Sequence, residues 1–186
     1  MKIHNIALCV CVMVLAAAAT SNADEPLPLK NPGFEEGLDG WLTKGGDFDM
    51  SHAVPDAAHT GKLGLRVTDA DDKHGSSLMS EQFDVEQGRT FELRFWVRNI
   101  SGHGLAVYLQ FLDKTGYKLT DVVDTLTNAH SNQIKVIIPE DATEWKQFTV
   151  RGVAPPTSTK MYIWIHSGNA AVCVTDLDDF ELVRVN

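Results

Sequence analysis

The sequence NPGFEEG, residues 31–37, is the stretch around which we expect the fold to be organised. Pro32 fixes one backbone angle and Gly33 reaches conformations closed to other residues, so the pair predicts a tight turn. Phe34 supplies an apolar plug, and Glu35 places a carboxylate beside the carbonyl oxygens of the turn. Calcium binds through carbonyl and carboxylate oxygens. The stretch therefore indicates either a structural calcium site or a surface turn with an aromatic anchor and solvated acids.

Residues 1–23 have the pattern of a secretory signal peptide. Lys2 supplies a positive start, and residues 6–19 form an apolar segment that is too short to span a membrane as a helix. Ser21-Asn22-Ala23 offers small residues for cleavage. We expect cleavage after Ala23 and a secreted protein, periplasmic or extracellular, that does not insert into the membrane.

The remaining residues, 24–186, are enough for a single domain with a sizeable core. Cys173 is the one cysteine left after cleavage, so an internal disulfide is excluded and we expect a small residue in or near the core. The formal net charge is −9, and no Lys/Arg stripe indicates nucleic-acid binding. This acidity argues against strongly anionic polysaccharides as partners, although local basic groups could override it.

Short strands separated by turn residues account for most of the chain. Residues 91–99 alternate cleanly between apolar and polar side chains, and residues 105–111 do the same. A polar loop is expected at 69–75, a hairpin turn at 113–116, and irregular structure at 118–131. The expected strands cover 41–50 (broken at 45–46), 62–68, 77–85, 91–99, 105–111, 133–138, 145–153, 160–166 and 172–185. This pattern predicts an all-β fold, an antiparallel β-sandwich or barrel.

The last strand carries an unusual acidic residue. If the alternation continues unbroken, Asp178 shares a side with Phe180 and Leu182 and faces the core. A buried carboxylate is costly unless it is paired or bound to a metal. First and last strands often meet in a sandwich, so we expect Asp178 to approach Glu35.

Five motifs in this order resemble carbohydrate-binding modules of families four, nine and twenty-two: NPGFEEG with a following GW, HTGKLGLRV, FELRFWVRN, EWKQFTV and DLDDFEL. The resemblance implies a jelly roll of the galactose-binding-domain-like type. It also implies a structural calcium with Glu35 and Asp178 as side-chain ligands. Backbone oxygens would come from Gly33 or Pro32 and from Lys62 or its neighbour, and Thr60 stands where some relatives have a carboxylate.

Sugar binding is expected on a concave sheet whose outer face is aromatic and polar. Sugar rings stack their C–H faces on aromatic rings, and their hydroxyl groups pair with polar side chains. Trp164 is favoured, although a loop such as 118–131 could cover either tryptophan and make it part of the core. The candidate ligand-binding residues are Arg94, Trp96, Arg98, Tyr108, Gln110, Tyr162, Trp164 and His166.

The expected function is that of a non-catalytic, monomeric module that binds a polysaccharide or oligosaccharide. No HExxH or GxSxG motif is present. One alternative is a jelly-roll polysaccharide lyase that uses Tyr108, Gln110, His166 and Arg98. Another is a structural domain that binds a protein partner at the cell surface.

Overall fold

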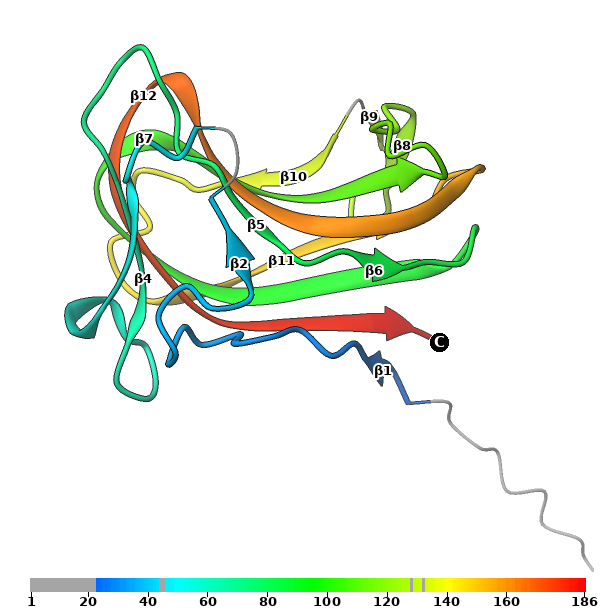
Figure 1. Ribbon diagram of the computed structural model, residues 1–186, viewed down its shortest axis with the longest axis horizontal. Coiled ribbons are helices and arrows are strands. Elements are labelled where there is room, and N and C mark those ends of the chain that lie inside the picture. The colour runs from blue at the N-terminus through cyan, green and yellow to red at the C-terminus, as the bar shows by residue number, and fades with distance from the viewer. Residues whose placement is uncertain (1–22, 44–45, 128, 132) are drawn as a thin grey trace, which may run out of the picture.

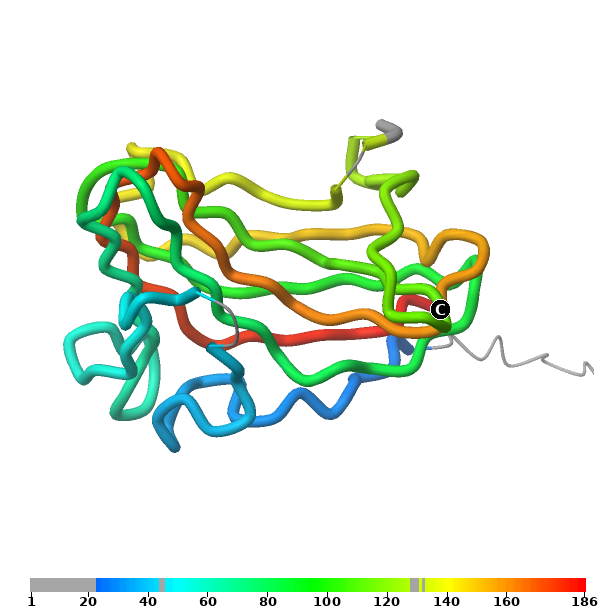
Figure 2. Tube along the Cα trace, turned by 45° about the horizontal axis from the view of Figure 1, so that its top comes forward, coloured from blue at the N-terminus to red at the C-terminus, as the bar shows by residue number. Residues whose placement is uncertain are grey.

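The computed structural model describes residues 23–43, 46–127, 129–131 and 133–186, and it confirms the all-β jelly-roll sandwich (Figure 1). Two long strands, β7 (Thr90–Asp113) and β12 (Ser158–Val185), pair antiparallel along most of their length. Each strand bends near its middle and so belongs to both layers of the sandwich (Figure 2). The predicted strands 91–99 and 105–111 are therefore one strand, and so are 160–166 and 172–185.

The two layers differ in which half of each long strand they contain. Layer A consists of β11 (Lys146–Val153), residues 90–99 of β7, residues 174–185 of β12, β4 (Gly64–Asp69), β3 (Ser51–Val54) and β1 (Glu25–Pro26). Layer B consists of β10 (Ile134–Ile137), residues 105–113 of β7, residues 158–167 of β12, β5 (Leu78–Ser80), β2 (Trp41–Leu42) and β6 (Phe83–Asp84). β8 (Val122–Asp124) pairs with the end of β11 and with β9 (Ala129–Ser131).

Glycines allow the bend at residues 99–104 of β7. Gly102 and Gly104 have φ angles of 73° and 99°, which are unfavourable for side-chain-bearing residues. A Cβ on Gly102 would lie 1.9 Å from the carbonyl oxygen of Val172. The bend thus depends on a residue with no side chain where β7 passes close to β12.

The core lies between the layers, as the alternation predicts. Phe34 is fully buried, and its ring centroid lies 5.0 Å from that of Trp41 and 5.8 Å from that of Phe180. This confirms Phe34 as an apolar plug. The inward-facing side chains of β7 are all almost fully buried: Phe91, Leu93, Phe95, Val97, Leu105, Val107, Leu109 and Phe111.

Three predicted segments differ from the structure. Among the described residues of 41–50 only Trp41–Leu42 is a strand, because the chain turns through Phe48 and Asp49, both at positive φ. Residues 77–85 form two short strands, β5 and β6, separated at 81–82. The stretch 118–131 contains β8 and β9, and the loop after β4 begins at residue 70 because Asp69 is buried and bonded to Ser167.

The prediction that Asp178 faces the core is wrong. The register of β12 shifts between Asp178 and Glu181, and Asp179 adopts a positive φ of 50°. This bulge adds one residue, so Leu177 and Phe180 both point inward and Asp178 points out from layer A. Its side chain is nevertheless fully buried, because the turn at 59–61 covers it.

Cys173 is buried, as predicted, and desolvation raises the pKa of its thiol to about 11. Residues 1–22 of the predicted signal peptide lie outside the described residues. Within the described ranges no helix has the length and hydrophobicity needed to cross a membrane.

Candidate functional site

Five of the predicted ligand-binding side chains gather on the outer face of layer B. Trp164 of β12 lies opposite Tyr108 of β7 in the strand register, and Tyr162 lies opposite Gln110. The Tyr108 and Trp164 ring centroids are 4.8 Å apart, and His166 stacks on Trp164 at 4.3 Å with an interplanar angle of 13°. We call these five residues the aromatic face.

The segment just before β5 holds Trp164 and His166 in place. Trp164 Nε1 donates a hydrogen bond of 3.0 Å to Ser77 Oγ, and His166 Nδ1 is hydrogen-bonded to the carbonyl oxygen of Ser76. Trp164 and His166 are half-buried, whereas Tyr108, Tyr162 and Gln110 are buried. Desolvation raises the pKa of the hydroxyl groups of both Tyr108 and Tyr162.

Two lysines that the sequence reasoning missed lie over these rings. Lys118 Nζ is 4.3 Å from the centroid of the Trp164 ring, and Lys135 Nζ is 5.3 Å from that of Tyr108. Lys135 lies opposite Tyr108 in the β10–β7 register, so the alternation of 133–138 was the available signal. Lys118 follows the hairpin turn at 113–116 and begins the stretch 118–131, which was expected to be irregular, so no strand alternation indicated where its side chain points.

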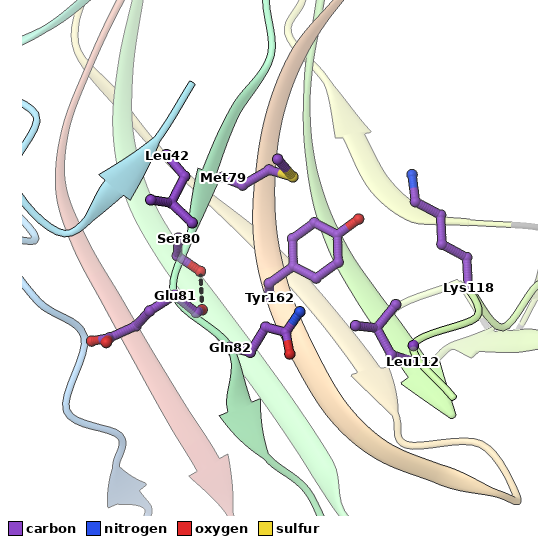
Figure 3. Close-up of a pocket in the computed structure, with 9 residues that line it drawn as sticks. Leu42, Met79, Ser80, Glu81, Gln82, Leu112, Lys118 and Tyr162 are labelled. Atoms are coloured by element: carbon purple, nitrogen blue, oxygen red, sulfur yellow. Dashed lines mark hydrogen bonds between the residues drawn. The ribbon is translucent and has the colours of Figure 1, made fainter. Parts of the chain in front are cut away.

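Two hollows flank Trp164 along the sheet. The first has a volume of about 510 Å³ and is lined by Tyr162, Met79 and Lys118 among others (Figure 3). The second has a volume of about 330 Å³ and includes Trp164, His166 and Phe48 in its lining. The aromatic face thus lies between two spaces large enough to take parts of an extended ligand.

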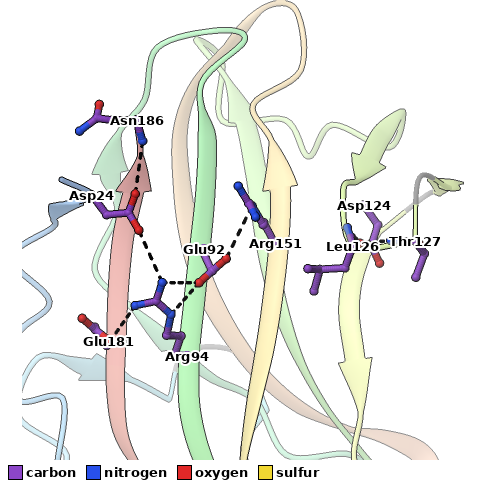
Figure 4. A network of polar contacts seen from close by, with 9 residues as sticks. All are labelled: Asp24, Glu92, Arg94, Asp124, Leu126, Thr127, Arg151, Glu181 and Asn186. Carbon is purple, nitrogen blue, oxygen red and sulfur yellow. Dashed lines mark hydrogen bonds and ion pairs between the residues drawn. The ribbon is translucent and has the colours of Figure 1, made fainter. Parts of the chain in front are cut away.

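Arg94, Trp96 and Arg98 do not join this group, because their half of β7 belongs to layer A. Arg94 is held by Glu92 (Nε to Oε1, 2.6 Å), Glu181 and Asp24, and the bond to Glu92 is the main cause of its raised pKa (Figure 4). These three residues were expected to share one surface with Trp164, and the bend in β7 is why they do not.

Trp96 and Arg98 support a loop on the outside of layer A. Trp96 stacks on His59 with ring centroids 4.1 Å apart, and Arg98 Nη2 donates to Asp176 Oδ2 at 2.7 Å and to the carbonyl oxygen of Asp56 at 2.8 Å. The four residues that a lyase would need are therefore divided, with Arg98 on one layer and Tyr108, Gln110 and His166 on the other.

The predicted calcium ligands meet at one end of layer A. Glu35 Oε1 accepts hydrogen bonds from the backbone N–H groups of Lys62 and Leu63, at 2.8 and 3.1 Å. Asp178 Oδ2 accepts from the N–H groups of His59 and Thr60, at 2.7 and 3.1 Å. The opening turn reaches the same place, because the carbonyl oxygen of Pro32 accepts a bond from the N–H of Phe180.

The carboxylate and carbonyl oxygens of this cluster are the ligand types that a hard cation such as calcium prefers. Two carboxyl groups meet the opening turn here, because a Cβ on Gly33 would lie 3.5 Å from Asp178 Oδ1 and 3.8 Å from Asp179 Oδ1. Burial raises the pKa of Asp178, which favours its neutral form until a cation binds. However, N–H donors already occupy Glu35 Oε1 and both oxygens of Asp178. No group of three or more His, Cys, Asp or Glu side chains suited to a metal exists among the residues described. Calcium would therefore depend largely on carbonyl oxygens.

A family profile of carbohydrate binding domains, that of carbohydrate-binding modules 4 and 9, matches residues 28–172. The chain belongs to this family. No protein in the curated comparison matches the sequence. Among solved structures, the module is similar to the xylan-binding domain CBM22-1 of Xyn10C from Paenibacillus barcinonensis, with 19% identity, a TM-score of 0.61, and coverage of 88% of this chain and 97% of that one.

Two further structures share the fold. "Family 16 Carbohydrate Binding Module-2" is 20% identical, with a TM-score of 0.56 and coverage of 83% of this chain and 98% of that chain. TmCBM61, solved with β-1,4-galactotriose, is 23% identical, with a TM-score of 0.55 and coverage of 84% and 97%. At these identities the likeness supports the jelly-roll fold and leaves the ligand to be argued from this chain's own residues.

Proposed function

We propose that this module binds a polysaccharide or oligosaccharide along the aromatic face of layer B, without catalysing its cleavage. The observation that carries the proposal is the half-buried Trp164, which lies 4.8 Å from Tyr108 between two hollows. An aromatic floor stacks with the C–H face of a sugar ring, while Gln110 and His166 supply polar groups for its hydroxyls.

Two further points support this choice of surface. The corresponding outer face of layer A is occupied by ion pairs of Arg94 and Arg98 and by the stacking of Trp96 on His59. Two similar structures are a module in complex with β-1,4-galactotriose and a xylan-binding domain, which makes an extended neutral chain the first probe.

The test is a pair of tryptophan variants measured by glycan array and by thermal melt. Trp164→Ala should abolish glycan binding while shifting the melting temperature by only a few degrees, because the side chain is half-buried. Trp96→Ala is the matched control on layer A and should retain binding. Loss of binding in both folded variants, or in neither, would contradict the assignment.

A structural calcium ion is a second part of the proposal. Glu35 and Asp178 would supply carboxylate oxygens, Gly33 and Lys62 carbonyl oxygens, and Thr60 a further oxygen. Such an ion would stabilise the folded state by about 2.7 kcal/mol at a hundredfold excess over its dissociation constant. Chelation should lower the melting temperature, and Asp178→Ala should remove the response. An unchanged melting temperature in chelator, with no metal found by elemental analysis, would contradict the calcium site. The hydrogen bonds of Glu35 and Asp178 alone would then hold this region together.

We also propose export after cleavage behind Ala23. Asp24, the first residue that cleavage would leave, contacts the fold directly: its carboxylate lies 3.6 Å from Arg94 Nη2 and accepts from the Asn186 N–H. N-terminal sequencing of the protein recovered outside the cytoplasm should therefore begin at Asp24. A mature protein that retains Cys9 and Cys11 would contradict this proposal.

A further inference from the structure

Two ammonium groups, those of Lys118 and Lys135, stand over the rings of the aromatic face. Neither Lys118 nor Lys135 forms an ion pair in the part of the chain that the structure describes. Other lysines of this acidic protein do have partners: Lys30 pairs with Asp39 at 2.9 Å and Lys160 with Asp84 at 2.5 Å. The positive charge over Trp164 and Tyr108 is therefore available to a ligand.

The acidic residues nearby are turned away from the two lysines or are already engaged. Glu81 lines the same hollow as Lys118, but its carboxylate points away from Tyr162 and Lys118 in Figure 3, and its charge acts on Lys30. Asp71 bonds to His74, and Asp113 accepts bonds from residues of its own turn. Asp121, three residues after Lys118, also has an interaction partner.

Position also matters, because Lys118 lies over the ring that a sugar would contact. With His166 stacked on Trp164 and Lys118 above the same ring, a neutral sugar can reach the indole only after Lys118 moves. A sugar that carries a carboxylate at its ring edge can instead form new bonds with the ammonium groups that it displaces. It can lay its C–H face on Tyr108 and Trp164 while its carboxylate accepts charge-assisted hydrogen bonds from the displaced ammonium groups.

We propose that the aromatic face selects acidic glycans, those with uronate residues, through Lys118 and Lys135. The inference rests on the proposed function and narrows it to a ligand class. The overall charge of −9 argues against an anionic ligand, but Lys118 and Lys135 give this one surface a local positive charge. The proposal therefore revises the expectation drawn from net charge.

The test compares acidic glycans with their neutral counterparts. Binding of polygalacturonate, alginate and glucuronoxylan is measured by affinity electrophoresis and calorimetry, each beside the same polymer after its carboxyl groups have been reduced to alcohols. We expect at least one acidic polymer to bind more tightly than its reduced form, and its affinity to fall as sodium chloride rises. A sulfated galactan, run in parallel, distinguishes carboxylate from sulfate recognition.

Lysine variants connect the preference to the site. Lys118→Gln and Lys135→Gln should each weaken binding of the acidic form about tenfold, and should leave binding of the reduced form unchanged or tighter. Lys146→Gln, an exposed lysine at the start of β11 in layer A, is the matched control and should change neither. A merely structural role for Lys118 and Lys135 would weaken both forms together.

The outcomes separate this inference from the proposed function. Equal binding of acidic and reduced polymers, with Trp164→Ala still abolishing both, overturns the acidic preference and keeps the sugar site. A preference for sulfate over carboxylate also overturns it. Failure of wild type to bind any polymer in either form overturns both proposals.

Discussion

Replacement of Asp176 by alanine should destabilise the protein by about 3 kcal/mol. Its fully buried carboxylate accepts bonds from Arg66 Nε and Nη2, at 2.7 and 3.0 Å, and from Arg98 Nη2 at 2.7 Å. Removing one partner of a buried ion pair costs about 3–5 kcal/mol, because the other charge stays without compensation. The two arginine side chains are 27% and 29% exposed, so water compensates them in part and the lower end applies.

Urea denaturation followed by tryptophan fluorescence measures the change. Asp84→Ala is the matched control: its pair with Lys160 has the same chemistry, but its side chain is 89% exposed, so about 0.5 kcal/mol or less is expected. Sugar binding should survive in folded Asp176→Ala, because Asp176 belongs to layer A. A loss of stability below about 1 kcal/mol would refute the idea that this carboxylate ties the two arginines into the fold.

Three further predictions concern the bend, the thiol and the bulge. Gly102→Ala should cost at least about 2 kcal/mol in urea melts, because its Cβ would meet the Val172 carbonyl at 1.9 Å, whereas Gly88→Ala, with a similar φ but open space, should cost less. Cys173 should resist a disulfide reagent at pH 8 until the protein unfolds, because burial raises its thiol pKa to about 11; fast labelling of native protein would contradict this. The pKa of Asp178 is raised mainly by burial, so the folded state binds its proton more tightly than the unfolded state. That contribution to stability is present at low pH and is lost as the pH rises through the folded-state pKa, so calcium-free melts of Asp178→Asn should lack this pH dependence.

Alternation identified the core faces of the long strands but not how the strands continue. Phe91 and Leu105 belong to the apolar sides of the alternating stretches 91–99 and 105–111, and both are buried. The link between them is a bend made by Gly102 and Gly104, which in sequence is indistinguishable from a loop. The bulge at Asp179 is similarly hidden, because a bulge breaks the period of two on which the prediction depends.

The sequence identified candidate binding residues, but it did not show which of them lie on the same layer. Tyr108, Trp164 and His166 were correctly placed on one outer face, since all three alternate with buried neighbours on β7 and β12. Trp96 alternates in the same way, and only the bend decides that it belongs to the other layer. Lys118 reaches Trp164 across strands distant in sequence, so no local pattern could reveal that contact.

Because β7 and β12 run through both layers, we expect the two layers to open together. The amides of residues 90–99 and 105–113 should therefore exchange with deuterium in one cooperative event. A ligand that binds layer B stabilises the whole closed state. It should slow exchange at Leu93 in layer A by the same factor as at Leu109 beneath the ligand, so a distant amide can report occupancy of the sugar site.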